Sequence, residues 1–305
     1  MKIFIIGGTG HVGSYMVPQL VRQGHEVFIG TRGNTAVKSY SSTEGVTFLT
    51  CDSTDVENLR ALRVHNFDVV IDMPGSAYNI WCAFSDCVKH VIACGSLWMY
   101  GNPSVVPTPE IEQSECPFLG YAGRYKRIKQ MCEESGKDGK AVFTAIMPPN
   151  ICGPGKAPLE CMGGRSIDVH KAHMAGEPVI LPEGPECMIG PCHAADIAQL
   201  FILAVNNREA AAGQIFNAGA EYALTASQMV KVYSKIYGVE IPIKRVSWEK
   251  YSTEINSDIG HWWHFYAHML PDISKAKKLL GYKPQYTPEQ ALETAVEWMK
   301  AEGKI

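Results

Sequence analysis

The sequence predicts an α/β protein, in which a Rossmann-type, doubly wound parallel sheet is followed by a smaller C-terminal substrate lobe. Three observations support this fold class. A short apolar run at residues 3–6 leads directly into glycines at positions 7, 10 and 13. Strand and helix patterns then alternate through the first 150 residues. These strands are almost continuously apolar, which is typical of parallel strands covered by helices on both faces.

The first element, MKIFIIGGTGHVG, reads as a strand, a glycine turn and the start of a helix. Glycine lets the chain reverse tightly, and a bare backbone lets a pyrophosphate approach the amides at the helix N-terminus. The pattern is specific here because it directly follows a buried strand. It predicts a dinucleotide site that includes Gly7, Thr9, Gly10, His11, Val12 and Gly13.

The second strand, residues 26–32, bears on the choice of cofactor. A strand that serves NAD usually ends in an acidic residue that binds the ribose 2′-hydroxyl. Here the end is Thr31-Arg32, with Lys38 nearby. A guanidinium suits a 2′-phosphate, so we expect NAD(P) with a preference for NADP. Arg32 could instead stack on adenine with either cofactor, or be a solvated loop cation.

Further elements follow in order. Residues 46–50 form a third strand, and Asp52 and Ser53 follow it at the expected cofactor edge. Residues 55–62 are helical, and strands are expected at 68–73, 89–94 and 141–147. We assign residues 1–150 to the NAD(P)-binding domain. Residues 151–305, richer in glycine and proline, form mainly the substrate lobe, interleaved with late Rossmann elements.

Composition excludes several classes of protein. The 305 residues are 46% hydrophobic and 19% charged, with a net charge of −3 and no long basic run. Nucleic-acid and membrane partners are therefore not expected. No stretch has the length of a membrane span, and no secretory signal is recognisable. We expect a cytoplasmic protein whose 10 cysteines are reduced, and their spacing does not predict a metal site.

Candidate catalytic residues follow the fifth strand. Ser96 lies at the C-terminal end of that strand, where open α/β sheets bind their ligands. Downstream, Tyr125 and Lys129 are one helical turn apart on the same face. An ammonium beside a phenol lowers the phenol pKa, which makes tyrosine a usable acid or base. Lys129 could also bind the nicotinamide ribose, and Ser96 could hold the substrate oxygen.

These motifs resemble the extended short-chain dehydrogenase/reductase family, in its NAD-dependent epimerase/dehydratase branch. The resemblance covers nearly the whole chain. It includes the glycine motif, Ser-x-x-x-Tyr-Gly from Ser96, Tyr-x-x-x-Lys from Tyr125, the Pro148–Gly155 segment, His193–Ala198, Phe216-Asn217 and Asp272–Ala276. The resemblance implies that Pro148 lies beside the cofactor and that Asn150 binds substrate.

A second tyrosine competes for the catalytic role. The segment beginning at Tyr121, YAGRYK, resembles the family's Tyr-Gly-x-x-Lys with one residue inserted. If Tyr121 were the acid, its lysine would be five residues away and off the helical face. We therefore favour Tyr125 with Lys129, and we assign Tyr121 to the wall of the substrate pocket.

Two departures from the family pattern limit the substrate. Met147 stands where an arginine usually precedes the proline motif, and residues 260–268 read GHWWHFYAH where a diphosphate-binding arginine is usual. An aromatic ring cannot replace a guanidinium fork. We expect a small hydroxylated or keto substrate, carbohydrate-derived and without a nucleoside diphosphate, whose apolar face Trp262 or Trp263 would cover. Arg165, Lys244 or Arg245 could reach in from other loops. The aromatic stripe could also be core or a dimer contact, and we expect a homodimer.

The sequence thus predicts an NAD(P)-dependent oxidoreductase or epimerase that acts on a hydroxyl or keto carbon of a small molecule. Oxidation, reduction and epimerisation share the hydride-transfer step, so the sequence does not separate them. The alternatives are a nucleotide-sugar epimerase or dehydratase, and a non-catalytic NAD(P)-sensing or RNA-binding relative.

Overall fold

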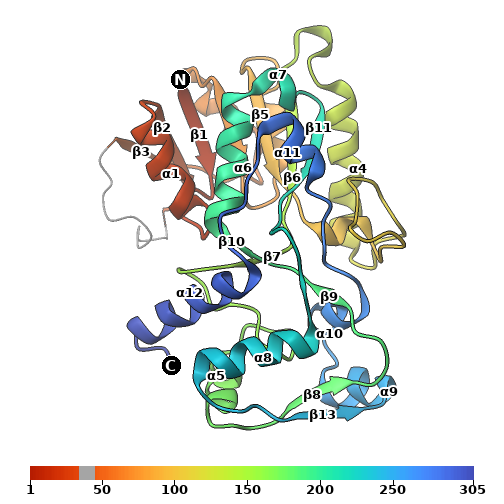
Figure 1. Cartoon of the computed structure of the whole chain (residues 1–305). Helices are drawn as coiled ribbons and strands as arrows, with labels where there is room; N and C mark the ends of the chain where they lie inside the picture. The colour runs from red at the N-terminus through yellow and green to blue at the C-terminus, as the bar shows by residue number, and fades with distance from the viewer. Residues whose placement is uncertain (34–44) are drawn as a thin grey trace.

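A computed structural model describes residues 1–33 and 45–305 of the chain. Figure 1 shows two halves: a sheet covered by helices, which holds the N-terminus, and a smaller lobe, which holds the C-terminus. The chain does not simply finish one half before it begins the other. After entering the lobe at β7, it returns to the sheet through α6 and β11, and it returns again through α11.

The central sheet has seven parallel strands in the order β11-β6-β5-β4-β1-β2-β3. The strands are β1 (Lys2–Ile6), β2 (Glu26–Thr31), β3 (Val46–Thr50), β4 (Val69–Asp72), β5 (His90–Cys94), β6 (Val142–Met147) and β11 (Gln214–Asn217). In β1, Ile5 lies opposite Ile29 of β2 and Ile71 of β4. The order reverses between β1 and β4, and sheets of this kind bind ligands outside the strand ends at that point.

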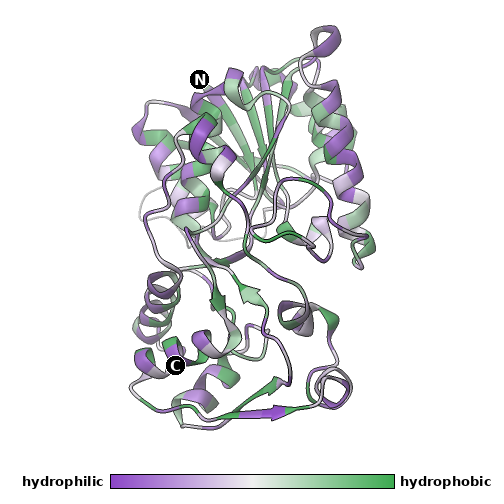
Figure 2. Cartoon of the chain, turned by 45° about the vertical axis from the view of Figure 1, so that its right-hand side comes forward, coloured by the Kyte–Doolittle hydropathy of each residue, from purple (hydrophilic) through white to green (hydrophobic). Residues whose placement is uncertain are grey.

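Both faces of the sheet are buried, as the apolar strands predict. In β1, Ile3 and Ile5 join the core beneath one helical layer, while Phe4 and Ile6 join the core beneath the other. One layer consists of α1 (Gly13–Arg22), α6 (Ala194–Asn206), α7 (Arg208–Ala211) and α11 (Ser274–Leu280). The other consists of α2 (Val56–Ala61), α3 (Ala77–Phe84) and α4 (Leu119–Glu134). Figure 2 shows the hydrophobic strands enclosed by helices with hydrophilic outer faces.

The predicted fold class is confirmed, and the predicted strands differ from the observed ones by no more than one residue at either end. The helix predicted for residues 55–62 is α2 followed by a 3₁₀ helix, η1 (Leu62–His65). A further 3₁₀ helix, η3 (Lys137–Gly139), connects α4 to β6. The close agreement follows from the glycine and polar residues that bound each apolar run.

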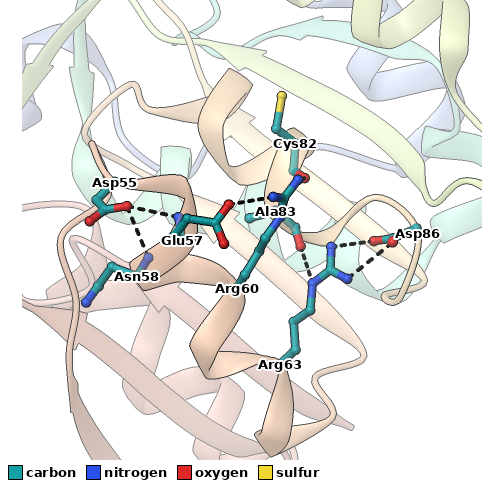
Figure 3. Close-up of polar contacts among 8 residues, drawn as sticks. All are labelled: Asp55, Glu57, Asn58, Arg60, Arg63, Cys82, Ala83 and Asp86. Atoms are coloured by element: carbon teal, nitrogen blue, oxygen red, sulfur yellow. Dashed lines mark hydrogen bonds and ion pairs between the residues drawn. The ribbon is translucent and has the colours of Figure 1, made fainter.

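Two arginines attach α2 and η1 to the end of α3 (Figure 3). Arg60 donates to the carbonyl of Cys82 at 3.3 Å, and Arg63 donates to the carbonyl of Ala83 at 2.6 Å. Arg63 also holds both oxygens of Asp86. The last carbonyls of a helix have no partner within the helix, so these guanidinium groups satisfy them.

The lobe has its own apolar core. It contains α5 (Ile167–Met174), α8 (Ala226–Tyr237), α9 (Trp248–Lys250), a π-helical turn η4 (Tyr251–Ile255), α10 (Ile259–Tyr266) and α12 (Pro288–Ala301). Three two-stranded ladders complete it: β8 (Val179–Pro182) with β13 (Ile243–Val246), β7 (Asn150–Cys152) with β10 (Pro191–His193), and β9 (Met188–Ile189) with β12 (Leu224–Thr225). In the described part of the chain, no helix combines the length and apolar character needed to cross a bilayer.

Candidate functional site

A cavity of about 560 Å³ opens where the C-terminal ends of β4, β5 and β6 face the lobe. Its walls come from both halves of the molecule. They consist of Met73, Pro74, Cys94, Gly95, Ser96, Trp98, Tyr121, Arg124, Pro148, Pro149, Asn150, Ile151, Lys156, Leu159, Gly163, Gly164, Arg165, Gly260, His261 and His264. This is the sheet edge at which the sequence predicted the chemistry.

The glycine turn has the geometry that a dinucleotide requires. Gly7 has a φ of 78°, and the amide of Gly10 donates to its carbonyl at 3.0 Å. A Cβ on Gly13 would lie 2.1 Å from the carbonyl oxygen of Gly8. Val12 precedes the first residue of α1 and is buried, and Thr9 lies within the turn. The turn therefore presents bare backbone at the N-terminus of α1, which favours an anion.

Two aromatic side chains connect this turn to the lobe. The ring of His11 is hydrogen-bonded through Nε2 to the carbonyl of Gly153 at 3.1 Å, and the Tyr15 hydroxyl donates to the carbonyl of Pro154 at 3.0 Å. Burial lowers the pKa of His11 to about 4, so the ring is neutral near pH 7. The segment 153–155 is thereby held over the glycine turn.

The four remaining residues predicted at the adenosine end lie after neighbouring strands. Thr31 ends β2, and its hydroxyl accepts from the amide of Gly33 at 2.9 Å. Asp52 and Ser53 follow β3, and the Ser53 hydroxyl lies 2.8 Å from that of Ser76. Arg32 is exposed beside this edge, whereas Lys38 lies outside the described residues.

Asp52 is held in its ionised form. Hydrogen bonds from the amide and hydroxyl of Thr54 lower its pKa, and the nearby charge of Arg32 makes a smaller contribution. The adenosine end thus combines a carboxylate after β3 with an exposed guanidinium after β2.

The structure brings Ser96, Pro148 and Asn150 together in the walls of the cavity. Ser96 precedes η2 (Leu97–Tyr100), and its hydroxyl accepts from the amide of Trp98 at 3.3 Å. Asn150 opens β7 and is 6% exposed. Its Nδ2 has no hydrogen-bond partner within the described residues. An unpaired buried donor is costly.

The structure does not bring Tyr125 and Lys129 to the cavity, contrary to the expectation for a catalytic and cofactor-binding pair. Tyr125 is 3% exposed, lies in the sheet core, and packs edge-on against Tyr100. Burial raises the pKa of Tyr125 to about 12, which opposes proton transfer near neutrality. Lys129 lies over the Tyr125 ring but pairs with Glu112 at 2.8 Å, and both charged side chains are exposed.

Tyr121 and Arg124 take the place expected for that pair. Both line the cavity, and the guanidinium carbon of Arg124 lies 5.5 Å from the centroid of the Tyr121 ring. Arg124 also donates to the carbonyl of Cys94 at 3.1 Å. A Cβ on Gly75 would lie 2.3 Å from Nη2 of Arg124, so the glycine leaves room for the guanidinium. Sequence reasoning missed Arg124, although its position three residues after Tyr121 puts both on one helical face.

Asp72, at the end of β4, is the buried carboxyl group beneath Arg124. Its Oδ1 accepts from the amides of Gly75 and Ser76, while its Oδ2 has no partner within the described residues. Burial raises the pKa of Asp72 to about 6, and the hydrogen bond from Ser76 and the charge of Arg124 oppose that rise. Its strand position was predicted, but its burial was not.

The lobe contributes α10, but not through the residue that the sequence favoured. Gly260, His261 and His264 line the cavity. Trp262 does not: it packs edge-on against Trp248 in an aromatic cluster of the lobe. Burial lowers the pKa of His264 to about 3, so this ring is neutral at physiological pH. The structure therefore does not bring Trp262 to the cavity, because α10 turns its histidine face towards it.

Two cations of the lobe also line the cavity. Arg165 donates to the carbonyls of Ala157 and Ile151 at 2.7 and 3.0 Å, and Lys156 lies in the same wall. Arg165 was one of three cations considered from the sequence. Another, Arg245, instead pairs with Glu186. Met147 is fully buried, and its sulfur would lie only 2.1 Å from a Cβ added to Gly95.

Comparisons with known proteins agree with this architecture. The chloroplast stem-loop binding protein of 41 kDa b from Arabidopsis thaliana is 27% identical over 299 residues, which cover 93% of this chain and 75% of that protein. A UDP-glucose 4-epimerase from Stenotrophomonas maltophila, solved with NAD and formylated UDP-arabinopyranose, superposes with a TM-score of 0.79 and 18% identity, covering 100% of this chain and 99% of that one. A UDP-glucose 4-epimerase from Thermotoga maritima, solved with UDP-glucose, has a TM-score of 0.76 and 20% identity, covering 99% of each chain.

These structures share the Rossmann-type fold that the glycine motif and the alternating strands and helices predicted. The sequence pattern of the NmrA-like family matches residues 1–301, nearly the whole chain. The chain therefore belongs to the NmrA-like family.

Proposed function

We propose that this protein binds NAD(P) and acts as an oxidoreductase or epimerase on a hydroxyl or keto carbon of a small, carbohydrate-derived substrate. The observation that carries the proposal is the meeting of Ser96, Tyr121 and Asn150 in one cavity at the C-terminal edge of the sheet. These residues supply two hydroxyl groups and a side-chain amide, and they can bind and orient a hydroxylated carbon.

The residues of the glycine turn fit a dinucleotide. Gly13 has no room for a Cβ, and the turn lies at the start of α1. A pyrophosphate there would meet backbone amides and the positive end of the helix dipole. The Stenotrophomonas maltophila epimerase of the same fold was solved with NAD. When bound, NAD(P) supplies the acceptor or donor of a hydride.

Each cavity residue then has a defined task. The Ser96 hydroxyl and the Asn150 amide hold substrate oxygens, and the Tyr121 hydroxyl takes or returns the proton of the reacting hydroxyl group. Arg124 lies beside Tyr121 and would stabilise negative charge that develops on the phenol oxygen. Tyr121 replaces Tyr125 in this role because Tyr125 lies within the core.

A second candidate is a dinucleotide-binding protein without turnover. One observation favours it: the lysine of the predicted pair, Lys129, is bound to Glu112 away from the cavity, and an arginine stands beside Tyr121 instead. Arginine is effectively always protonated, so Arg124 cannot relay a proton as lysine can. The relative from Arabidopsis thaliana is named a stem-loop binding protein, so its name describes binding and not catalysis.

Cofactor titration followed by a turnover screen tests both candidates. NAD, NADP and their reduced forms are titrated by fluorescence, and free sugars, sugar acids, sugar phosphates and sugar nucleotides are then incubated with the loaded protein. A change in nicotinamide absorbance or the appearance of an epimer supports the enzyme. Cofactor binding with no turnover of any substrate class supports the second candidate. Absence of cofactor binding overturns both.

A further inference from the structure

We infer that the substrate carries a phosphate monoester, and that Lys156 and Arg165 bind it. This inference rests on the proposed function, because it names the class of substrate for the same cavity. The two cations lie in one wall of the cavity, with His261 as a third lining residue from α10. A phosphate monoester carries close to two negative charges near neutral pH.

Arg165 is fixed in place without a neutralising partner. Its two terminal nitrogens donate to the carbonyls of Ala157 and Ile151, which orient the guanidinium but do not cancel its charge. In the described residues, no carboxylate oxygen lies within 4.0 Å of Arg165 or of Lys156. A fixed guanidinium with unused positive charge is a suitable anion-binding group.

Lys156 brings a second positive charge close to the first. Burial lowers the pKa of Lys156, and repulsion from Arg165 lowers it further. Glu160 interacts electrostatically with Arg165 but forms no ion pair with it, and its carboxyl oxygens accept from the amides of Met162 and Gly164. Burial also raises the pKa of Glu160, which disfavours its charged form. An incoming dianion would relieve the repulsion between the two cations.

The position of the two cations associates them with the substrate. They share their cavity with Ser96, Tyr121 and Asn150. Both charges also act on His11 of the glycine turn, but the glycines of the turn are not among the walls of this cavity. A phosphate bound at Lys156 and Arg165 would therefore be attached to the molecule whose hydroxyl group reaches Tyr121.

The charges beyond Arg165 favour one phosphate over two. A neighbouring hollow of about 500 Å³ shares Gly164, Arg165 and His261 with the cavity. Among the described residues that line it, Arg165 is the sole lysine or arginine, and Glu160 adds a carboxyl group. A second phosphate in that hollow would lose its hydration without gaining a further fixed cation, which is costly.

Calorimetry on the NADP-loaded protein tests the inference. The probes are glucose 6-phosphate, ribose 5-phosphate, glucose, gluconate, inorganic phosphate and UDP. The variants are Lys156→Met, Arg165→Met and, because loss of the Arg165 hydrogen bonds could unfold the loop, the charge-preserving Arg165→Lys. Lys231→Met on α8, an exposed lysine absent from the cavity walls, is the matched control.

We expect a sugar phosphate to bind more tightly than the neutral sugar. Lys156→Met and Arg165→Met should each weaken that binding by about tenfold or more, the loss expected for one charge-assisted contact. Arg165→Lys should lose less, and Lys231→Met should lose nothing. Cofactor affinity should stay within a factor of about two of the original in all four, because the two cations share their cavity wall with Ser96 and Tyr121 and not with the glycines of the turn.

Three outcomes would overturn the inference. Equal binding of glucose and glucose 6-phosphate would exclude a phosphate subsite. An equal loss of NADP affinity in Lys156→Met and Arg165→Met would assign the cations to the cofactor. Tighter binding of UDP than of any monophosphate would assign them to a nucleoside diphosphate. The proposed function fails separately: sugar phosphates would then bind, with the expected dependence on Lys156, but none would be turned over.

Discussion

The guanidinium of Arg124 lies over the ring of Tyr121, with its central carbon 5.5 Å from the ring centroid, and both side chains line the same cavity. The spacing of three residues places them on one face of α4. Tyr125, one residue further along, points into the core instead. Tyr121, which lines the cavity, and Tyr125, which packs in the core, are thus one helical turn apart.

Replacement of Tyr121 by phenylalanine should abolish turnover while leaving cofactor binding nearly unchanged. The substitution removes the hydroxyl group that transfers the proton but keeps the ring that packs against Trp98. We expect kcat to fall by about 10²–10⁴, the usual contribution of general acid–base catalysis. Steady-state kinetics and a fluorescence titration of NADPH measure the two effects.

Tyr125→Phe is the matched control for that experiment. It removes the corresponding hydroxyl group from a ring buried in the core, 5.4 Å from Tyr100. We expect turnover close to that of the unmodified protein. If Tyr125→Phe is inactive and Tyr121→Phe is active, the assignment of the reacting tyrosine from the cavity walls is wrong.

Arg32 should select NADP over NAD. It is exposed after β2, beside the ionised carboxylate of Asp52. A 2′-phosphate would gain a charge-assisted contact from Arg32 that a 2′-hydroxyl would not. We expect Arg32→Ala to weaken NADP binding by about 1.5–3 kcal/mol more than NAD binding. Equal losses for both cofactors in a titration would show that Arg32 only stacks on adenine, and Arg22→Ala on α1 controls for loss of a surface charge.

Gly13 should tolerate no side chain. A Cβ there would lie 2.1 Å from the Gly8 carbonyl oxygen, so the turn would have to open. We expect Gly13→Ala to lower the free energy of unfolding by about 1–3 kcal/mol, as for other overpacked sites. Gly123→Ala in α4 is the control, because a Cβ there has nothing within 4 Å. It should raise stability by about 0.5–1 kcal/mol, and urea denaturation distinguishes the two.

The strands and the glycine turn could be predicted from the sequence because local patterns determine them. An apolar run bounded by glycine or polar residues, such as Lys2–Ile6, has few ways to fold other than as a buried strand. The prediction of which face of α4 lines the cavity was wrong for a different reason. Tyr125, Ile128 and Met131 share its buried face, but the Tyr-x-x-x-Lys spacing was given more weight than this apolar stripe.

The lobe side of the cavity was harder to predict. Lys156 and Arg165 lie in a loop segment without helical or strand periodicity, and two backbone carbonyls fix the orientation of Arg165. Nothing in the local sequence specifies those contacts. The short helix α10 carries aromatic and histidine side chains on all sides, so its pattern did not show that His261 rather than Trp262 would face the cavity.

Asp72 should make the stability of the protein depend on pH, with a sign opposite to that of a salt-bridged carboxylate. Burial raises the pKa of Asp72 to about 6, from the ordinary value of 3.8 for an aspartate. Above pH 7 the group is ionised in both states, and the folded state bears the cost of burying the charge. As the pH falls through 6, the folded protein takes up a proton before the unfolded chain does. Asp72 therefore lowers the free energy of unfolding most at high pH, and this destabilisation decreases as the pH falls towards 4.

Asp72→Asn should remove this dependence. Between pH 8 and pH 5 the unmodified protein should gain roughly 1 kcal/mol relative to the variant, measured as the difference between their free energies of unfolding in urea at each pH. Asp68→Asn is the control: a hydrogen bond from Lys89 lowers the pKa of Asp68, so that carboxyl group stays ionised in both states over this range and its variant should show no such trend. A constant difference between Asp72→Asn and the unmodified protein from pH 8 to pH 5 would mean that Arg124 neutralises Asp72 in the folded state, and that the carboxylate is part of the cavity's charge balance.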